Sequence, residues 1–107
     1  MVKAMAAGAY RELGEYKKSE EYLKDAYMKV ALVHGEEHLA TSSILNGMGM
    51  LYKKQERFER GRDAYERALD IAEKMLGDEH PETMATRHNL GELFLAWDKK
   101  EQAMEYL

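Results

Sequence analysis

Two histidines four residues apart are the first residues in this sequence whose types and spacing could do chemistry. On one helix face, His34 and His38 could share a zinc ion. Gly35 falls between them, the sequence has no cysteine, and no third ligand follows at a suitable spacing. The spacing of these two residues therefore predicts no metal site.

Catalytic groups are equally sparse. Ser42 and Ser43 lack a histidine and an acid in the pattern that activates a nucleophile, and the sequence contains no glycine-rich phosphate loop. The acidic residues of 20–25 and 56–70 alternate with basic residues at helical spacing, which is typical of a solvated helix face with weak ion pairs. We therefore expect no enzyme activity, no catalytic residues and no cofactor.

Composition narrows the alternatives further. The 107 residues include 20 acidic and 16 basic side chains, for a net charge of −4, without a basic block that would suggest nucleic acid. The longest apolar stretches are far shorter than a membrane span, and the first residues lack the apolar core of a signal peptide. We therefore expect a protein or peptide partner. Because cysteine is absent, we also expect a cytoplasmic or other reducing intracellular location.

The sequence repeats itself after 42 residues. The segment GEEHLAT, which begins at Gly35, aligns with GDEHPET, which begins at Gly77. The same shift places Tyr10 on Tyr52 and Gly49 on Gly91, so it holds in helical stretches and in loops. A repeat at this period predicts a stacked array, whose elongated surface suits the binding of other molecules.

Helical spacing of apolar residues predicts six helices of alternating length. One stripe runs from Tyr16 to Val33 and another from Phe58 to Leu76, with Met75 included. Gly77 suits a helix C-terminus with positive φ, Pro81 suits the first turn of the next helix, and His80 falls near its N-cap. In the first copy Thr41 is expected to satisfy free N–H groups. The expected spans are 3–14, 16–33, 39–55, 58–76, 82–97 and 99 to the end.

In the second copy, Met48-Gly49 is followed by Tyr52, then by Phe58, Gly61, Tyr65 and Ala68-Leu69, and the third copy has Leu90-Gly91 with Phe94 and Ala103. This pattern resembles the tetratricopeptide repeat. The usual repeat has about 34 residues. The longer spacing here, with the loop Leu76-Gly77-Asp78-Glu79-His80-Pro81, is similar to the kinesin light chain type of repeat.

The resemblance implies an all-α fold, a right-handed superhelix of antiparallel helix pairs. It implies a single domain over 1–107 with three repeats, roughly 1–38, 39–80 and 81–107, the last incomplete. Small residues should let the helices of a pair approach closely, with Gly49 opposite Gly61 and Gly91 opposite Ala103. Trp97, Met104 and Leu107 are then expected to be exposed, or covered by further repeats of a longer array, by self-association or by a partner.

The resemblance also implies where a partner binds. In this family the first helix of each pair lines the concave face, so a peptide or extended protein segment is expected there. Asparagines would bond its backbone and lysines would pair with its acidic side chains. The protein would then be a non-catalytic interaction scaffold or adaptor, the alternative being a structural subunit of a larger complex. The implied residues are Arg11, Asn46, Met50, Lys53, Lys54, His88, Asn89 and Glu92.

Overall fold

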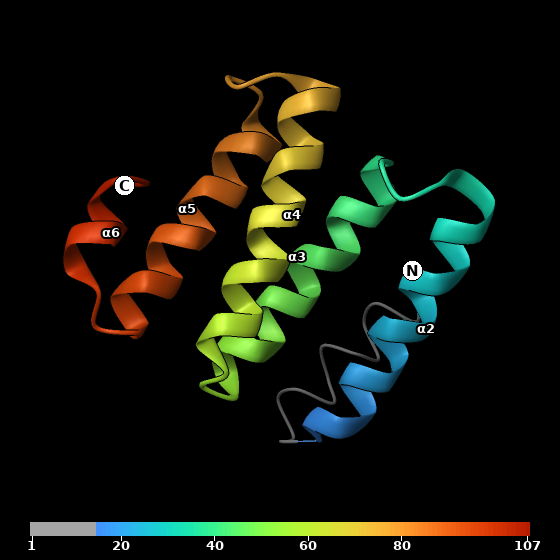
Figure 1. The fold of residues 1–107 in the computed structure, drawn as a ribbon, viewed down its shortest axis with the longest axis horizontal. Helices are drawn as coiled ribbons and strands as arrows, with labels where there is room; N and C mark the ends of the chain where they lie inside the picture. Colours follow the sequence, from blue (N-terminus) through green and yellow to red (C-terminus); the bar gives the residue numbers. More distant parts are fainter. Residues whose placement is uncertain (1–14) are drawn as a thin grey trace.

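The computed structural model describes residues 15–107, which are helical without any strand. The helices are α2 (Tyr16–His34), α3 (Leu39–Lys54), α4 (Phe58–Leu76), α5 (Pro81–Ala96) and α6 (Lys100–Met104). They alternate in direction and lie in chain order across the molecule (Figure 1). The predicted all-α arrangement of antiparallel pairs is confirmed for this range, and the helix expected over 3–14 lies outside it.

Each long loop ends one helix with a glycine and begins the next with a histidine. Gly35 and Gly77 have φ of +86° and +90°, which a glycine adopts without steric cost. His80 is the N-cap of α5, as its position predicted, and α5 begins at Pro81, one residue earlier than expected. The prediction for Thr41 is wrong. Its hydroxyl donates to the carbonyl of Gly35, and His38 caps α3 instead.

The two short turns repeat one another in detail. Glu56 and Asp98, 42 residues apart, both have positive φ, 59° and 61°. The next residue in each turn, Arg57 or Lys99, donates its N–H to the carbonyl five residues earlier at 2.8 Å. This is the Schellman motif, which reverses the chain within two residues and sets α4 antiparallel to α3.

Small residues bring the paired helices together, as predicted. A Cβ on Gly61 would lie 3.4 Å from the carbonyl oxygen of Gly49, and one on Gly91 would lie 3.4 Å from that of Ala103. Tyr65 fills the space over Gly49 and belongs to the cluster that α4 forms with α5 and α6. A second cluster joins α2, α3 and α4 through apolar side chains that include Leu23, Leu51 and Ile71.

Two residues of the predicted buried stripes are exposed. Val33 is 75% exposed and Met75 is 49% exposed. Both lie in the last turn of a long helix, two residues before the glycine that ends it. Neither side chain belongs to the two hydrophobic clusters, so the apolar stripe extends beyond the packed core at this turn.

Glu20 was predicted to lie on a solvated helix face, but it is mostly buried. Its side chain is only 16% exposed, and Lys24, Arg57 and Arg60 contact it at 3.2, 3.3 and 3.8 Å. The hydroxyl of Tyr52 donates to the same carboxylate at 3.2 Å. Desolvation raises the pKa of Glu20, but the hydrogen bonds from Lys24, Tyr52 and Arg57 outweigh it, so the pKa lies below its ordinary 4.5. Glu20 thus joins α2 to α3 and α4.

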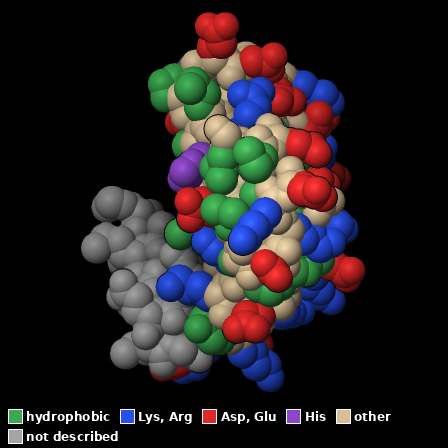
Figure 2. Space-filling model, turned by 90° about the vertical axis from the view of Figure 1, so that its left-hand side faces the viewer, with side chains coloured by type: hydrophobic (Ala, Val, Ile, Leu, Met, Phe, Trp, Pro, Cys, Tyr) green, Lys and Arg blue, Asp and Glu red, His purple; other side chains and the backbone are tan. Residues whose placement is uncertain are grey.

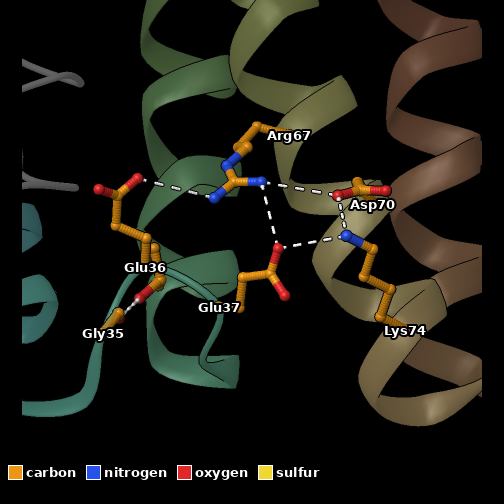
Figure 3. A network of polar contacts seen from close by, with 7 residues as sticks. Gly35, Glu36, Glu37, Arg67, Asp70 and Lys74 are labelled. Atoms are coloured by element: carbon orange, nitrogen blue, oxygen red, sulfur yellow. Dashed lines mark hydrogen bonds and ion pairs between the residues drawn. The ribbon is translucent and has the colours of Figure 1, made fainter.

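Acidic residues of the loop between α2 and α3 reach across to α4 (Figure 3). Glu37 contacts Lys74 at 3.2 Å and Arg67 at 3.9 Å, and Glu36 contacts Arg67 at 3.7 Å. Asp70 contacts the same two cations from α4 itself. Hydrogen bonds to Glu37 and Asp70 raise the pKa of Lys74. The loop is therefore held against the next helix pair by ion pairs.

Candidate functional site

A groove lies where the C-terminal halves of α3 and α5 face the beginning of α4. Its volume is about 690 Å³. Lysines and a methionine from α3 line one wall, and polar residues of α5 line the other. The lining residues are Met50, Lys53, Lys54, Glu56, Phe58, Tyr65, His88, Asn89, Glu92 and Ala96.

A second, smaller cleft of about 280 Å³ continues toward the N-terminal ends of the same two helices. Its walls are Ser42, Ser43 and Asn46 on α3, with Glu82, Ala85, Thr86 and Asn89 on α5. Asn89 lines both hollows, so they adjoin. Every predicted binding residue within 15–107 lines one or the other, whereas Arg11 lies outside the described residues.

Asn46 connects the two helices that form the clefts. Its amide nitrogen donates to the hydroxyl of Thr86 at 3.2 Å, and that hydroxyl donates to the carbonyl of Glu82 at 3.0 Å. The amide oxygen of Asn46 is buried and accepts no hydrogen bond. An unsatisfied buried acceptor costs about 1 to 3 kcal/mol. Because this oxygen is closed off from solvent, a donor in the smaller cleft reaches it only after the Asn46 side chain rotates.

Charges of opposite sign face each other across the groove. Within residues 15–107, neither Lys53 nor Lys54 makes an ion pair. On the opposite wall, the imidazole of His88 lies 3.3 Å from the carboxylate of Glu92. The α3 wall is thus basic, while the α5 wall presents a carboxylate.

The sequence of this chain matches a known family of repeat proteins. A family model described as "Tetratricopeptide repeat" matches residues 3–74 and again 40–107. The chain belongs to the tetratricopeptide repeat family. Its repeats are of the kinesin light chain-like type, as their 42-residue spacing predicted. α3 and α5 are the first helices of their pairs in this family's repeat.

Relatives of the chain are longer than it is. It is 32% identical over 96 residues to "Protein KINESIN LIGHT CHAIN-RELATED 2" of Arabidopsis thaliana, covering 89% of this chain and 14% of that protein. The crystal structure of BtubC (BKLC) from P. vanneervenii matches with a TM-score of 0.88 and 25% identity, over 99% of this chain and 42% of that one.

A second solved structure supports the fold alone. A putative kinesin light chain from Podosopora anserina, with nearly identical TPR-like repeats, matches with a TM-score of 0.88 and 21% identity. That match covers 98% of this chain and 50% of the other. The chain therefore spans half the length or less of these three relatives.

Some residues that line the groove of this tetratricopeptide repeat were not predicted to lie there. Phe58 and Tyr65 were assigned to the core because they occupy motif positions, yet both also reach the groove wall. Glu56 lines the groove from the turn after α3. Its position two residues after Lys54 was the only sequence signal that it could line the groove. The direction of its side chain depends on the positive φ of the turn.

The C-terminal side of the molecule is partly apolar. Figure 2 shows this side, where hydrophobic side chains lie among charged ones. Met104 and Leu107 are exposed, as predicted. Trp97 is instead half-buried, because its ring stacks on Phe58 and Phe94 with centroids 5.7 and 6.0 Å apart.

The two histidines with metal-ligand spacing in the sequence pack against each other. The rings of His34 and His38 stack with centroids 4.4 Å apart. Among residues 15–107, no three histidine or acidic side chains are grouped so as to hold a metal ion. None of the helices in this range is both long enough and apolar enough to span a membrane.

Proposed function

We propose that this protein is a non-catalytic interaction scaffold that binds an extended peptide or protein segment across α3 and α5. The observation that supports this most is the gathering of seven predicted residues along two adjoining clefts. Tetratricopeptide repeat proteins are in general protein-interaction scaffolds. The absence of cysteine favours a reducing intracellular compartment such as the cytoplasm.

The charges of the two walls would select which side chains the bound segment carries. Lys53 and Lys54 are free to pair with an acidic side chain, whereas Glu92 on the opposite wall favours a basic or neutral one. Met50 and Phe58 supply apolar contact between these charges. The preferred segment therefore has an acidic residue over α3, followed by an apolar residue.

The asparagines would hold the backbone of the segment. After rotation of its side chain away from Thr86, the amide oxygen of Asn46 would accept a backbone N–H. Asn89, which lines both clefts, would contact the next peptide unit. A side-chain amide bonds any peptide group, so these contacts give affinity without sequence preference. Sequence preference would come from the lysines and the apolar residues.

A peptide library displayed on phage provides a probe that does not presuppose the natural partner. Selected peptides would be measured by fluorescence anisotropy against the wild type and a triple variant, Asn46→Ala with Lys53→Ala and Lys54→Ala. We expect the variant to bind at least about tenfold more weakly, because it loses two charge pairs and one backbone bond.

The matched control removes two lysines and one amide outside the clefts, by Lys17→Ala, Lys29→Ala and Gln102→Ala. It should bind within about twofold of the wild type. A selection that yields no binder would count against the function, as would binders whose affinity the triple variant leaves unchanged.

A structural subunit held in a larger complex is the second candidate. Large apolar side chains are highly exposed on α2 and α6, among them Leu32 at 84% and Met104 at 77%. Such residues favour burial against another molecule. Light scattering tests this role, because a stable monomer that stays soluble at high concentration would contradict it.

A further inference from the structure

Histidines begin both of the helices that form the clefts. His38 is the N-cap of α3 and His80 is the N-cap of α5, and both have extended backbone angles. Nδ1 of His38 accepts a hydrogen bond from the backbone N–H of Ala40 at 3.0 Å. Nδ1 of His80 accepts one from the N–H of Glu82 at 3.1 Å. The same bond thus recurs at equivalent places in two repeats.

The proton content of the imidazole decides whether this bond exists. A neutral imidazole with its proton on Nε2 has a free lone pair on Nδ1, whereas an imidazolium has N–H donors at both nitrogens and accepts nothing. Proton uptake also places a positive charge at the positive end of the helix dipole, which is unfavourable. Both effects weaken the beginning of the helix.

The common N-cap residues do not behave in this way. Serine, threonine and asparagine keep their acceptor oxygen at every physiological pH. Histidine is the side chain whose charge ordinarily changes between about pH 8 and pH 5. A histidine at both positions therefore couples the first turns of α3 and α5 to proton concentration.

Neighbouring charges differ between the two caps. His38 stacks on the ring of His34 from α2, and near it Glu36 and Glu37 are bound to Arg67 and Lys74 of α4. Two stacked imidazolium ions would repel each other. The first turn of α3 is therefore the more sensitive to acid.

At the second cap the charged groups nearby are Asp78, Glu79 and Glu82, with Arg87 bound to Asp78 and to Glu73. The acidic groups offset part of the charge on an imidazolium but cannot restore its lost acceptor. Pro81 also fixes φ at the first position of α5. The start of α5 should therefore resist acid better than the start of α3.

We propose that His38 and His80 form a pH-sensitive device that loosens the first turns of α3 and α5 on acidification. The smaller cleft lies against the N-terminal halves of these helices, so loosening their first turns would open that end of the groove. The proposal concerns helix stability alone, and it stands whether or not the clefts bind a segment.

Thermal unfolding followed by circular dichroism tests the proposal at about pH 7.5 and about pH 5.5. The double variant His38→Asn with His80→Asn keeps an acceptor at both caps. Its melting temperature should fall less on acidification than that of the wild type, by about 4 °C or more. His38→Asn alone should remove more of the response than His80→Asn alone.

The control variant His88→Asn removes an imidazole that contacts neither cap and leaves the stack of His34 on His38 in place. It should retain most of the wild-type response. An equal response in the wild type and the double cap variant would overturn the proposal, as would loss of the response in the control alone.

Nitrogen-15 NMR of the histidine rings gives a test that does not depend on stability. At about pH 7.5, Nδ1 of His38 and His80 should be unprotonated and Nε2 protonated. Amide exchange at Ala40 and Glu82 should accelerate on acidification, relative to the intrinsic rate, in the wild type but not in the cap variant. A proton on Nδ1 at the higher pH would overturn the assignment of these rings as acceptors.

Discussion

Gly49 lies directly against the ring of Tyr65, so closely that a Cβ on Gly49 would come within 2.6 Å of the ring atom Cε1. Tyr65 is only 2% exposed, and α5 packs on its far side. The ring can therefore shift only toward the groove that it lines, and only by giving up its packing on α5. The position equivalent to this pair in the third repeat, Gly91 with Leu107, has the same short approach, but Leu107 is 57% exposed.

The different exposure of Tyr65 and Leu107 predicts that a glycine-to-alanine substitution costs more stability at Gly49 than at Gly91. Gly49→Ala should lower the free energy of unfolding by about 1 to 3 kcal/mol, the usual cost of overpacking a closed site. Gly91→Ala should cost less, because Leu107 can rotate into solvent. Urea unfolding of the two variants measures the difference. Equal costs would mean that the burial of Tyr65 does not limit the approach of α3 to α4.

The pKa of Glu20 predicts an acid-dependent loss of stability. Because the folded-state pKa lies below its ordinary 4.5, Glu20 stabilises the protein above that pH, and the contribution is lost as the pH falls through the folded-state value. Glu20→Gln should therefore lower stability at neutral pH and flatten the pH dependence below about 4.5.

Glu20→Ala should cost about 1 to 3 kcal/mol at neutral pH, since it removes charged hydrogen bonds to α3 and α4. The neighbouring Glu21 is exposed, so Glu21→Ala should change stability by less than about 0.5 kcal/mol. Chemical unfolding at several pH values compares the two. Identical pH profiles for Glu20→Gln and the wild type would contradict the role of this carboxylate.

Positive φ at the two short turns predicts stabilising substitutions. A non-glycine residue in the left-handed region costs roughly 1 to 2 kcal/mol, part of which a glycine loses again through the entropy of the unfolded chain. Glu56→Gly and Asp98→Gly should each raise stability by about 0.5 to 1 kcal/mol. Glu66→Gly, at an exposed position in the middle of α4, should instead lower it by about 1 kcal/mol. Melting temperatures that fall in all three variants would refute the left-handed assignment.

The architecture was predictable because the repeat encodes it several times over. Gly49 and Gly91, the aromatic residues that follow them, and the loop from Gly77 to Pro81 each indicate the same helix pair. Within residues 15–107, the expected helix boundaries consequently lie within one residue of the observed ones, except that α6 is shorter than expected. The binding residues that the family resemblance implied on α3 and α5 line the two clefts, and their role in binding stays a prediction.

Other features depended on contacts between elements remote in sequence. Glu20 looks like any exposed acid in its own helix, and only the approach of Tyr52 from α3 and of Arg57 from the turn before α4 buries it. Val33 looked buried by periodicity, but whether an apolar stripe is covered depends on what packs beside it. Periodicity describes one helix at a time. Helix identity and pairing therefore follow from local patterns in the chain, whereas burial, ion-pair partners and the shape of the groove arise only when distant segments meet.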